Sequence, residues 1–190
     1  MAKLLVTGHT GFVGRTPFHS ATEFGAVEDW QLDALPDNFD IRDPTLADLL
    51  AARAPDAILH LVASTNLDDS FRDPVGSFDV NFNGTHNLAF AASIGFAGRV
   101  LCVSSGDCYG VLPDDASPVD EERPLRPRNP YAVSKVGAEA LCYQWSQTEG
   151  LDVIIARPFN HIGPGQDARF AVALRERLEA SLKYWEQGAR

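Results

Sequence analysis

The sequence is poor in basic residues and contains no long apolar run. Its 16 lysines and arginines are outnumbered by 26 aspartates and glutamates, so the net charge is −10 and the isoelectric point is near 4.8. Nucleic-acid-binding domains carry basic patches that neutralise phosphates, so this acidity argues against a nucleic-acid partner. A helix that crosses a membrane needs about 20 consecutive apolar residues, and no stretch of the sequence has this character. We therefore expect no membrane segment.

Cysteine is scarce as well. Cys102, Cys108 and Cys142 make an odd count without the spacing of a metal site. The start of the sequence does not have the pattern of a signal peptide. We therefore predict no metal site, free thiols and a cytoplasmic location, with each cysteine acting as a small buried hydrophobe.

The composition is that of a soluble globular domain: 190 residues, of which 45% are hydrophobic and 22% charged. Short apolar runs alternate along the chain with segments of helical periodicity. The predicted strands are residues 4–7, 26–32, 57–62, 99–104 and 151–157, and the predicted helices are residues 45–53, 75–94 and 130–150. Continuous apolar runs are typical of parallel strands covered on both faces. This order indicates an α/β fold with a Rossmann-like doubly wound parallel sheet and a ligand at the carboxyl ends of its strands.

Some segments depart from this alternation. Pro17 weakens the helical pattern of residues 15–35, because it lacks the N–H group that a helix interior uses. Residues 113–130 are rich in proline and are predicted to form a long ordered loop near the site. Residues 168–190 have one amphipathic helical pattern, which follows a predicted dinucleotide-binding domain at residues 1–167.

The first predicted strand leads directly into Gly8, Gly11 and Gly14. In a strand–turn–helix unit, such glycines allow a tight turn, a close approach of backbone to a pyrophosphate, and packing of helix on strand. The pyrophosphate then lies on unpaired N–H groups at the positive end of the helix dipole. A glycine triplet also occurs in plain turns, but its place after a strand favours a dinucleotide site.

Tyr131 and Lys135 are four residues apart, so in a helix they share one face. An ammonium beside a phenol favours the phenolate and lowers the pKa of the tyrosine, which makes the tyrosine a usable acid near neutral pH. Ser105 follows the fourth predicted strand, and its hydroxyl can polarise the substrate oxygen that the tyrosine protonates. Each feature alone also suits a surface pair or a loop cap, but together they indicate an active site.

Several motifs resemble the extended short-chain dehydrogenase/reductase family of nucleotide-sugar enzymes, which includes the NAD-dependent epimerases and dehydratases. They are TGHTGFVG at residues 7–14, HLVA at 60–63, NFNGT at 81–85, SSGD at 104–107 and YAVSK at 131–135, in the family's order. A further motif, ARPFNHIGPGQ at residues 156–166, resembles the signature of GDP-6-deoxy-4-keto-mannose reductases and GDP-mannose 4,6-dehydratases. The SSGD motif and RNP at residues 128–130 are closer to the reductases.

The resemblance implies reduction of a GDP-4-keto sugar, as in the synthesis of GDP-rhamnose. Tyr131 would deliver a proton to the C4 oxygen, Ser105 would bind that oxygen, and Lys135 would bind the nicotinamide ribose and lower the pKa of Tyr131. The substrate contacts that the resemblance implies are Ser105, Gly106 and Asn160. The implied cofactor contacts are Gly8, Thr10, Gly11, Phe12, Val13, Gly14, Asp40, Ile41, Leu61, Val62, Ala63, Asn81, Tyr131, Lys135 and Pro158.

Asp107 stands where the resembled dehydratases carry a glutamate that helps to eliminate water between C5 and C6. Aspartate is one methylene shorter, and a simple reductase does not need this group. Asp107 is therefore a candidate catalytic residue that favours reduction over dehydration, with an exposed loop carboxylate as the alternative.

The choice between NADP and NAD stays open. An acidic residue about 20 residues after the glycines favours NAD, and Glu28, Asp29 and Asp33 are candidates. Arg15 can instead meet a 2′-phosphate or face solvent. Because the resembled reductases generally accept NADP, we expect NADP more than NAD.

Three functions fit these observations: a nucleotide-sugar 4-keto reductase, a dehydratase or epimerase that uses the same cofactor as a hydride shuttle, and a non-catalytic dinucleotide-binding module. Members of the resembled family are longer, and this chain stops near the start of their sugar-binding part. We therefore expect either a fragment or a shortened protein. The resemblance also implies a homodimer through the helices at residues 75–94 and 131–150.

Overall fold

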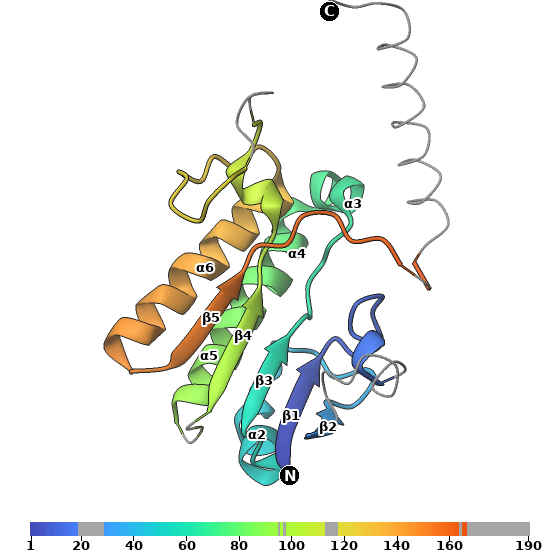
Figure 1. The fold of residues 1–190 in the computed structure, drawn as a ribbon, viewed down its shortest axis with the longest axis vertical. Coiled ribbons are helices and arrows are strands. Elements are labelled where there is room, and N and C mark those ends of the chain that lie inside the picture. The colour runs from blue at the N-terminus through green and yellow to red at the C-terminus, as the bar shows by residue number, and fades with distance from the viewer. Residues whose placement is uncertain (19–28, 95, 97, 113–117, 164, 167–190) are drawn as a thin grey trace, which may run out of the picture. The chain divides into compact units, whose positions relative to one another are not determined.

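Figure 1 shows a computed structural model of the chain, which describes residues 1–18, 29–94, 96, 98–112, 118–163 and 165–166. The chain divides into two compact units, Met1–Phe159 and Asn160–Arg190. The helices and strands named below belong to the first unit. The predicted amphipathic helix at residues 168–190 lies outside the described residues.

In the described part of the chain, five parallel strands form one sheet in the order β2-β1-β3-β4-β5 (Figure 1). The strands are β1 (Ala2–Thr7), β2 (Trp30–Ala34), β3 (Ala57–His60), β4 (Arg99–Val103) and β5 (Asp152–Ala156). This sheet confirms the predicted Rossmann-like α/β fold. The second strand begins later than predicted, because its ladder with β1 starts where Trp30 lies opposite Ala2.

The strand order reverses between β1 and β3. From β1 the chain passes to β2 on one side of the sheet, and from β3 it continues to β4 and β5 on the other side. Because all of these strands are parallel, the loops that follow them open at one edge. In open α/β sheets, ligands bind at this edge, where the order reverses.

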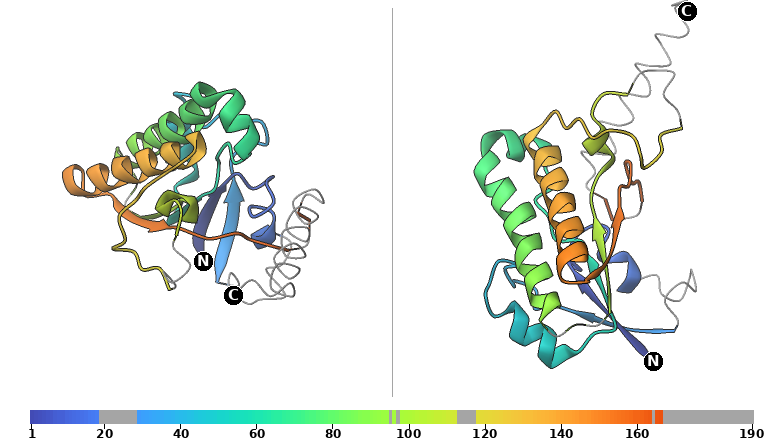
Figure 2. Two further views of the ribbon diagram at one scale, coloured as in Figure 1. Left: turned by 90° about the horizontal axis from the view of Figure 1, so that it is seen from above. Right: turned by 90° about the vertical axis from the view of Figure 1, so that its left-hand side faces the viewer.

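The helices α2 (Leu46–Arg53), α5 (Gly84–Ser93) and α6 (Pro130–Thr148) lie on one face of the sheet, with α5 and α6 side by side (Figure 2). Leu46 and Leu88 from these helices are buried in one core with Leu5, Ile58 and Val100 from the strands. Each such side chain contributes about 1.5–3 kcal/mol to folding. None of the helices among the described residues is long and apolar enough to cross a bilayer.

The single helix that the sequence predicted over residues 75–94 is interrupted. Helix α4 (Pro74–Phe78) runs into one π-helical turn, η1 (Asp79–Asn83), before α5 begins, and a short helix α3 (Leu67–Arg72) precedes it. Within η1, the side chain of Asn81 is 1% exposed and hydrogen bonds the backbone of Ser64. These bonds offset the poorer helical geometry, and π turns frequently mark functional sites.

Two irregular segments are partly described. Helical backbone begins at Thr16, so Pro17 lies in a first helical turn, where proline is tolerated because the N–H groups there have no intrahelical acceptor. The rest of the predicted poor helix, from residue 19 to residue 28, lies outside the described residues. In the predicted proline-rich loop, Arg126 N donates to Cys108 O at 2.9 Å, which places this part of the loop beside the turn after β4.

An ion pair joins α6 to the end of β5. Arg157 donates from Nε to both carboxylate oxygens of Glu139 at 3.0 Å and from Nη2 to Oε2 at 2.8 Å. The side chain of Glu139 is 6% exposed. Arg157 Nη1 also donates to Tyr109 Oη at 3.1 Å and to Glu121 O at 3.0 Å. One guanidinium therefore holds together α6, the end of β5 and the turn after β4.

Replacing Glu139 should destabilise the fold, because it leaves the charge of Arg157 partly buried without a carboxylate to balance it. We expect Glu139→Ala to lower the free energy of unfolding by about 3 kcal/mol. Asp69→Ala is the matched control, since Asp69 pairs with Arg72 at 3.2 Å with both side chains exposed; its effect should stay below about 0.5 kcal/mol. Urea unfolding of the two variants measures the difference, and equal effects would contradict this assignment.

Candidate active site

The predicted site residues of the first unit gather at the carboxyl edge of the sheet. Gly8, Thr10, Gly11, Phe12, Val13 and Gly14 follow β1, Asp40 and Ile41 follow β2, Leu61, Val62 and Ala63 follow β3, Ser105, Gly106 and Asp107 follow β4, and Pro158 follows β5. Asn81 lies in η1, and Tyr131 and Lys135 lie on the first turns of α6. Asn160 begins the second unit, so its role stays a prediction.

The turn after β1 is packed too tightly for side chains at two positions. Gly8 has a φ of +74°, and a Cβ there would lie 2.9 Å from Val62 N. A Cβ at Gly14 would collide with the carbonyl oxygen of Gly8. Thr10 and Val13, in the same turn, are exposed. A compact glycine turn, which lets backbone approach the ligand closely, is what a bound pyrophosphate requires, so these residues fit a dinucleotide.

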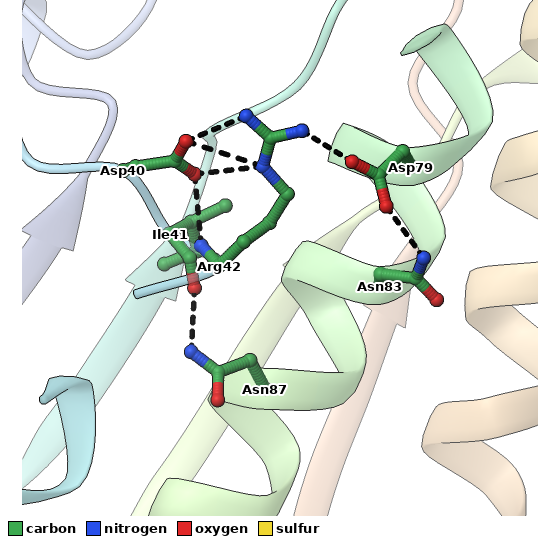
Figure 3. Close-up of polar contacts among 6 residues, drawn as sticks. All are labelled: Asp40, Ile41, Arg42, Asp79, Asn83 and Asn87. Atoms are coloured by element: carbon green, nitrogen blue, oxygen red, sulfur yellow. Dashed lines mark hydrogen bonds and ion pairs between the residues drawn. The ribbon is translucent and has the colours of Figure 1, made fainter. Parts of the chain in front are cut away.

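The loop after β2 is anchored to α5 (Figure 3). Asn87 Nδ2 donates to the carbonyl oxygen of Ile41 at 2.8 Å. It also donates to the carbonyl oxygen of Asp43 at 2.8 Å. Ile41 is 2% exposed and fills the space that Gly84 leaves free on the first turn of α5. The position of this loop is therefore set by buried contacts.

Arg42 adds exposed ion pairs to the same loop (Figure 3). Its Nη2 lies 2.6 Å from Asp40 Oδ2, and its Nη1 pairs with Asp79, which also accepts a hydrogen bond from Asn83. The hydrogen bonds from Arg42 lower the pKa of Asp40 to about 2, so this carboxylate is ionised at neutral pH. The side chain of Arg42 is 39% exposed. Such exposed pairs contribute little to stability.

Asn81 connects the loop after β3 to α6. Its Nδ2 donates to Ser64 O at 3.1 Å and to Ser134 Oγ at 2.8 Å, and its Oδ1 accepts from Ser64 N at 2.7 Å. Ser134 Oγ then donates to the carbonyl oxygen of Tyr131 at 2.6 Å. These bonds hold the first turn of α6, and with it Tyr131, against the neighbouring loop.

The turn that Ser105 caps packs against the first turn of α6, which carries Tyr131. Ser105 caps the 3₁₀ turn η2 (Gly106–Tyr109) by accepting a hydrogen bond from Asp107 N at 3.1 Å, and Cys108 in this turn contacts the backbone of α6. Burial raises the pKa of the Tyr131 phenol, and a hydrogen bond with Ser105 opposes this rise. The sequence predicted that Lys135 lowers this pKa. The structure differs, because burial of the phenol dominates.

Lys135 is almost completely buried, with 5% of its surface exposed. Burial lowers its pKa, and the nearby groups Cys102, Cys108, Cys142 and Glu139 oppose this effect. The three cysteines are free and buried, as predicted. Within the described residues, no group of three or more metal-ligating side chains could hold a metal ion.

The loop after β5 packs directly on the η2 turn. Gly106 N donates to Pro158 O at 2.8 Å, and a Cβ at Gly106 would lie 2.8 Å from the ring of Phe159. That ring stacks on Tyr109, with the centroids 6.3 Å apart. Gly106 therefore serves close packing beside the site, whereas the Asp107 side chain is exposed.

An acidic residue that the sequence analysis missed lies beside the glycine turn. Asp37 Oδ1 is 3.0 Å from His9 Nε2. Of the three acidic residues proposed for the ribose, Asp33 pairs with an arginine of α2, Asp29 precedes β2, and Glu28 lies outside the described residues. Asp37 follows the last glycine of the turn, Gly14, by a spacing close to the one expected of a ribose-binding acidic residue, and this spacing was the available signal.

Sequence reasoning also missed the polar residues behind the site. His60, Thr85 and Ser134 are buried, and the half-buried Asn87 anchors the loop after β2. Each lies in a segment whose neighbours form the core. A polar residue at a core position was the available signal, because buried polar groups require hydrogen-bond partners.

The sequence profile of the NAD dependent epimerase/dehydratase family matches residues 4–190. The chain belongs to this family. Its relatives in the family catalyse different reactions. GDP-6-deoxy-D-mannose reductase from Pseudomonas aeruginosa is 44% identical over 190 residues, which cover 99% of this chain and 62% of the relative. A dTDP-glucose 4,6-dehydratase from Streptomyces niveus is 39% identical over 127 residues, which cover 67% of this chain and 37% of that protein.

Solved structures of this epimerase/dehydratase family share the fold. RMD from Pseudomonas aeruginosa complexed with NADPH aligns with a TM-score of 0.82 and 43% identity, over 99% of this chain and 64% of that one. UDP-glucose 4-epimerase from Thermus thermophilus in complex with NAD aligns with a TM-score of 0.78 and 27% identity, over 87% and 57% of the two chains. This chain therefore spans less than two thirds of these relatives' length.

The anchoring of the loop after β2 predicts unequal effects at Asn87 and Arg42. Asn87→Ala removes both half-buried hydrogen bonds to the loop, so we expect dinucleotide affinity to fall about tenfold. Arg42→Met removes exposed ion pairs and should change the affinity by about threefold or less. Isothermal titration with NADPH and NADH measures both variants. A larger loss for Arg42→Met than for Asn87→Ala would show that the ion pairs position the loop.

Proposed function

We propose that this chain carries the cofactor-binding and catalytic part of a reductase that acts on the C4 keto group of a GDP-6-deoxy-4-keto-hexose. The observation that carries the proposal is the contact, at the carboxyl edge of the sheet, between the turn that Ser105 caps and the first turn of α6, which carries Tyr131. The relative that is 44% identical over nearly the whole chain is a GDP-6-deoxy-D-mannose reductase, which supports this substrate class.

The proposed reaction adds a hydride to the carbonyl carbon and a proton to its oxygen. A bound NADPH or NADH supplies the hydride. Tyr131 donates its phenolic proton to the oxygen, which Ser105 holds by a hydrogen bond. Burial raises the pKa of Tyr131, so the phenol carries its proton before the reaction. Lys135 hydrogen bonds the nicotinamide ribose, and its charge stabilises the phenolate that proton transfer leaves behind.

The cofactor is NADPH or NADH. Related structures contain NADPH in one case and NAD in another. In this chain, Gly8 and Gly14 supply the compact turn for the pyrophosphate, and Asp40 and Ile41 are assigned to the adenine. The free thiols fit a reducing compartment, so we place the protein in the cytoplasm.

A second candidate is a dehydratase or epimerase that regenerates its cofactor in each cycle. The similarity to a dTDP-glucose 4,6-dehydratase favours it. Under this alternative, Asp107 would act on the sugar, and its exposed side chain is free to do so. Only net reduction consumes one reduced cofactor per sugar, so the absorbance of the reduced nicotinamide separates the two candidates.

Tyr131→Phe should abolish turnover while leaving cofactor binding intact, because it removes the donated proton and little else. We expect the rate of NADPH oxidation with a GDP-4-keto sugar to fall on the order of 10²-fold or more, with an unchanged NADPH dissociation constant. Tyr143→Phe is the control, since Tyr143 lies on the same helix and is 64% exposed. Equal rates for Tyr131→Phe and the unmodified chain would leave a non-catalytic dinucleotide-binding module as the better description.

We also propose that two copies of the chain form a homodimer through α4, α5 and α6. Large apolar side chains are exposed on these helices and at the C-cap of α5, namely Val75, Phe90, Ile94, Val133 and Tyr143. Beside them lies a groove of about 730 Å³ between α4 and the start of α6, lined by Pro74, Phe78, Pro127, Pro130 and Val133 among others. Exposed apolar side chains beside an apolar groove are typical of protein–protein interfaces.

A charge in the groove beside the start of α6 should separate the two copies. Val133→Glu would bury a carboxylate in the proposed interface, so we expect its mass in solution to fall from that of a dimer to that of a monomer. Val111→Glu is the control, since Val111 is also exposed but lies outside these helices. Size-exclusion chromatography with light scattering gives the masses. A monomeric unmodified chain, or a dimeric Val133→Glu variant, would rule out this interface.

A further inference from the structure

His60 is the last residue of β3, and 2% of its surface is exposed. Both nitrogens of its ring make hydrogen bonds. Nδ1 lies 2.8 Å from Thr7 Oγ1 at the end of β1, and Nε2 lies 3.1 Å from Thr85 Oγ1 on α5. The ring therefore bridges the ends of two neighbouring strands and the helix that covers them.

The direction of these hydrogen bonds follows from the number of protons that the Thr85 hydroxyl can donate. Thr85 has one hydroxyl proton, and it donates this proton to the carbonyl oxygen of Asn81 at 2.6 Å. Thr85 Oγ1 must therefore accept from an Nε2–H group of His60. A neutral ring that is protonated on Nε2 has a bare Nδ1, which accepts the hydroxyl proton of Thr7.

Thr7 extends this chain of hydrogen bonds to the backbone. Its Oγ1 accepts from the N–H groups of Leu61 at 3.1 Å and Val62 at 3.3 Å. A doubly protonated ring would direct another donor at Thr7 Oγ1, whose two lone pairs these amides already use. Burial lowers the pKa of His60 to about 3, and the charge of Lys135 adds to this effect. The ring is therefore neutral at neutral pH.

The two ends of this series of hydrogen bonds reach two parts of the candidate site. At one end, the amide of Val62 lies directly against Gly8 of the glycine turn. At the other end, Asn81 donates a hydrogen bond to Ser134, which lies one helical turn after Tyr131. The cofactor-binding turn and the catalytic helix are thus connected through buried groups whose donors and acceptors are matched.

We propose that His60 and Thr85 are positioning residues of the dinucleotide site, whose hydrogen-bond chain sets the place of the loop after β3 between the glycine turn and α6. The proposal rests on the proposed function, since it assigns these hydrogen bonds to a cofactor site. Apolar side chains could fill the same volume, but they would not orient the Thr7 hydroxyl toward His60. Without that orientation, Thr7 Oγ1 no longer presents both lone pairs to the amides of Leu61 and Val62.

The test compares Thr85→Val, which keeps the shape but removes the hydroxyl, with Thr85→Ser, which keeps the hydroxyl. Long-range ¹H–¹⁵N NMR of the unmodified chain should show His60 protonated on Nε2 and bare on Nδ1 at pH 7, with His60→Asn identifying the signal. In Thr85→Val, we expect the ring proton to move to Nδ1 and the affinity for NADPH to fall about tenfold. Thr85→Ser should keep the ring signal and bind NADPH within about twofold of the unmodified chain.

Two results would overturn the proposal: a ring in the unmodified chain that carries a proton on Nδ1 at pH 7, or a Thr85→Val variant with unchanged ring signal and NADPH affinity. Thermal melting checks that each variant folds. If Thr85→Val does not fold, Thr85→Ala takes its place, and the ring signal of the unmodified chain still decides. An unmodified chain that binds neither NADPH nor NADH would instead contradict the proposed function. If the unmodified chain binds NADPH normally but His60 carries its proton on Nδ1, only the inference about His60 and Thr85 fails.

Discussion

Close contact between the backbones that follow β1 and β3 is the constraint on which the site depends. Gly8 lies so near the amide of Val62, and Gly14 so near the carbonyl of Gly8, that a side chain at either glycine would push the segments apart. The glycine turn and the loop after β3 consequently form one surface. That surface lies where the strand order reverses, so a dinucleotide placed there meets both loops at once.

Buried and half-buried polar groups, more than exposed ion pairs, hold the remaining elements around this surface. Asn81, Asn87 and the Glu139–Arg157 pair each connect a loop of the carboxyl edge to a helix or to another loop. In the interior, losing one partner leaves a desolvated group unpaired, which costs far more than losing the same contact in water. The exposed ion pairs of Arg42 lie in the loop after β2, which Asn87 anchors, but water competes with each of these pairs.

Much of the fold and part of the site could be predicted from local patterns. Apolar runs of strand length identify the sheet, because a strand buried on both faces needs apolar side chains at successive positions. The glycines after β1 and the spacing of Tyr131 and Lys135 are equally local, since each depends on backbone geometry over a few residues. Asp37 was within reach of the same reasoning, but its distance from the glycines also suits other acidic residues of the segment.

The sequence by itself therefore determined the order of strands along the chain, the glycine turn and the pairing of a phenol with an amine on one helix. Tertiary structure alone decided the π turn that directs Asn81 inward, the proton on His60 and the raised pKa of Tyr131. These properties depend on burial and on partners more than 15 residues away along the chain, such as Ser64 for Asn81, Thr7 for His60 and Ser105 for Tyr131. A local pattern specifies which groups a segment carries, whereas desolvation and hydrogen bonding act only after distant segments meet.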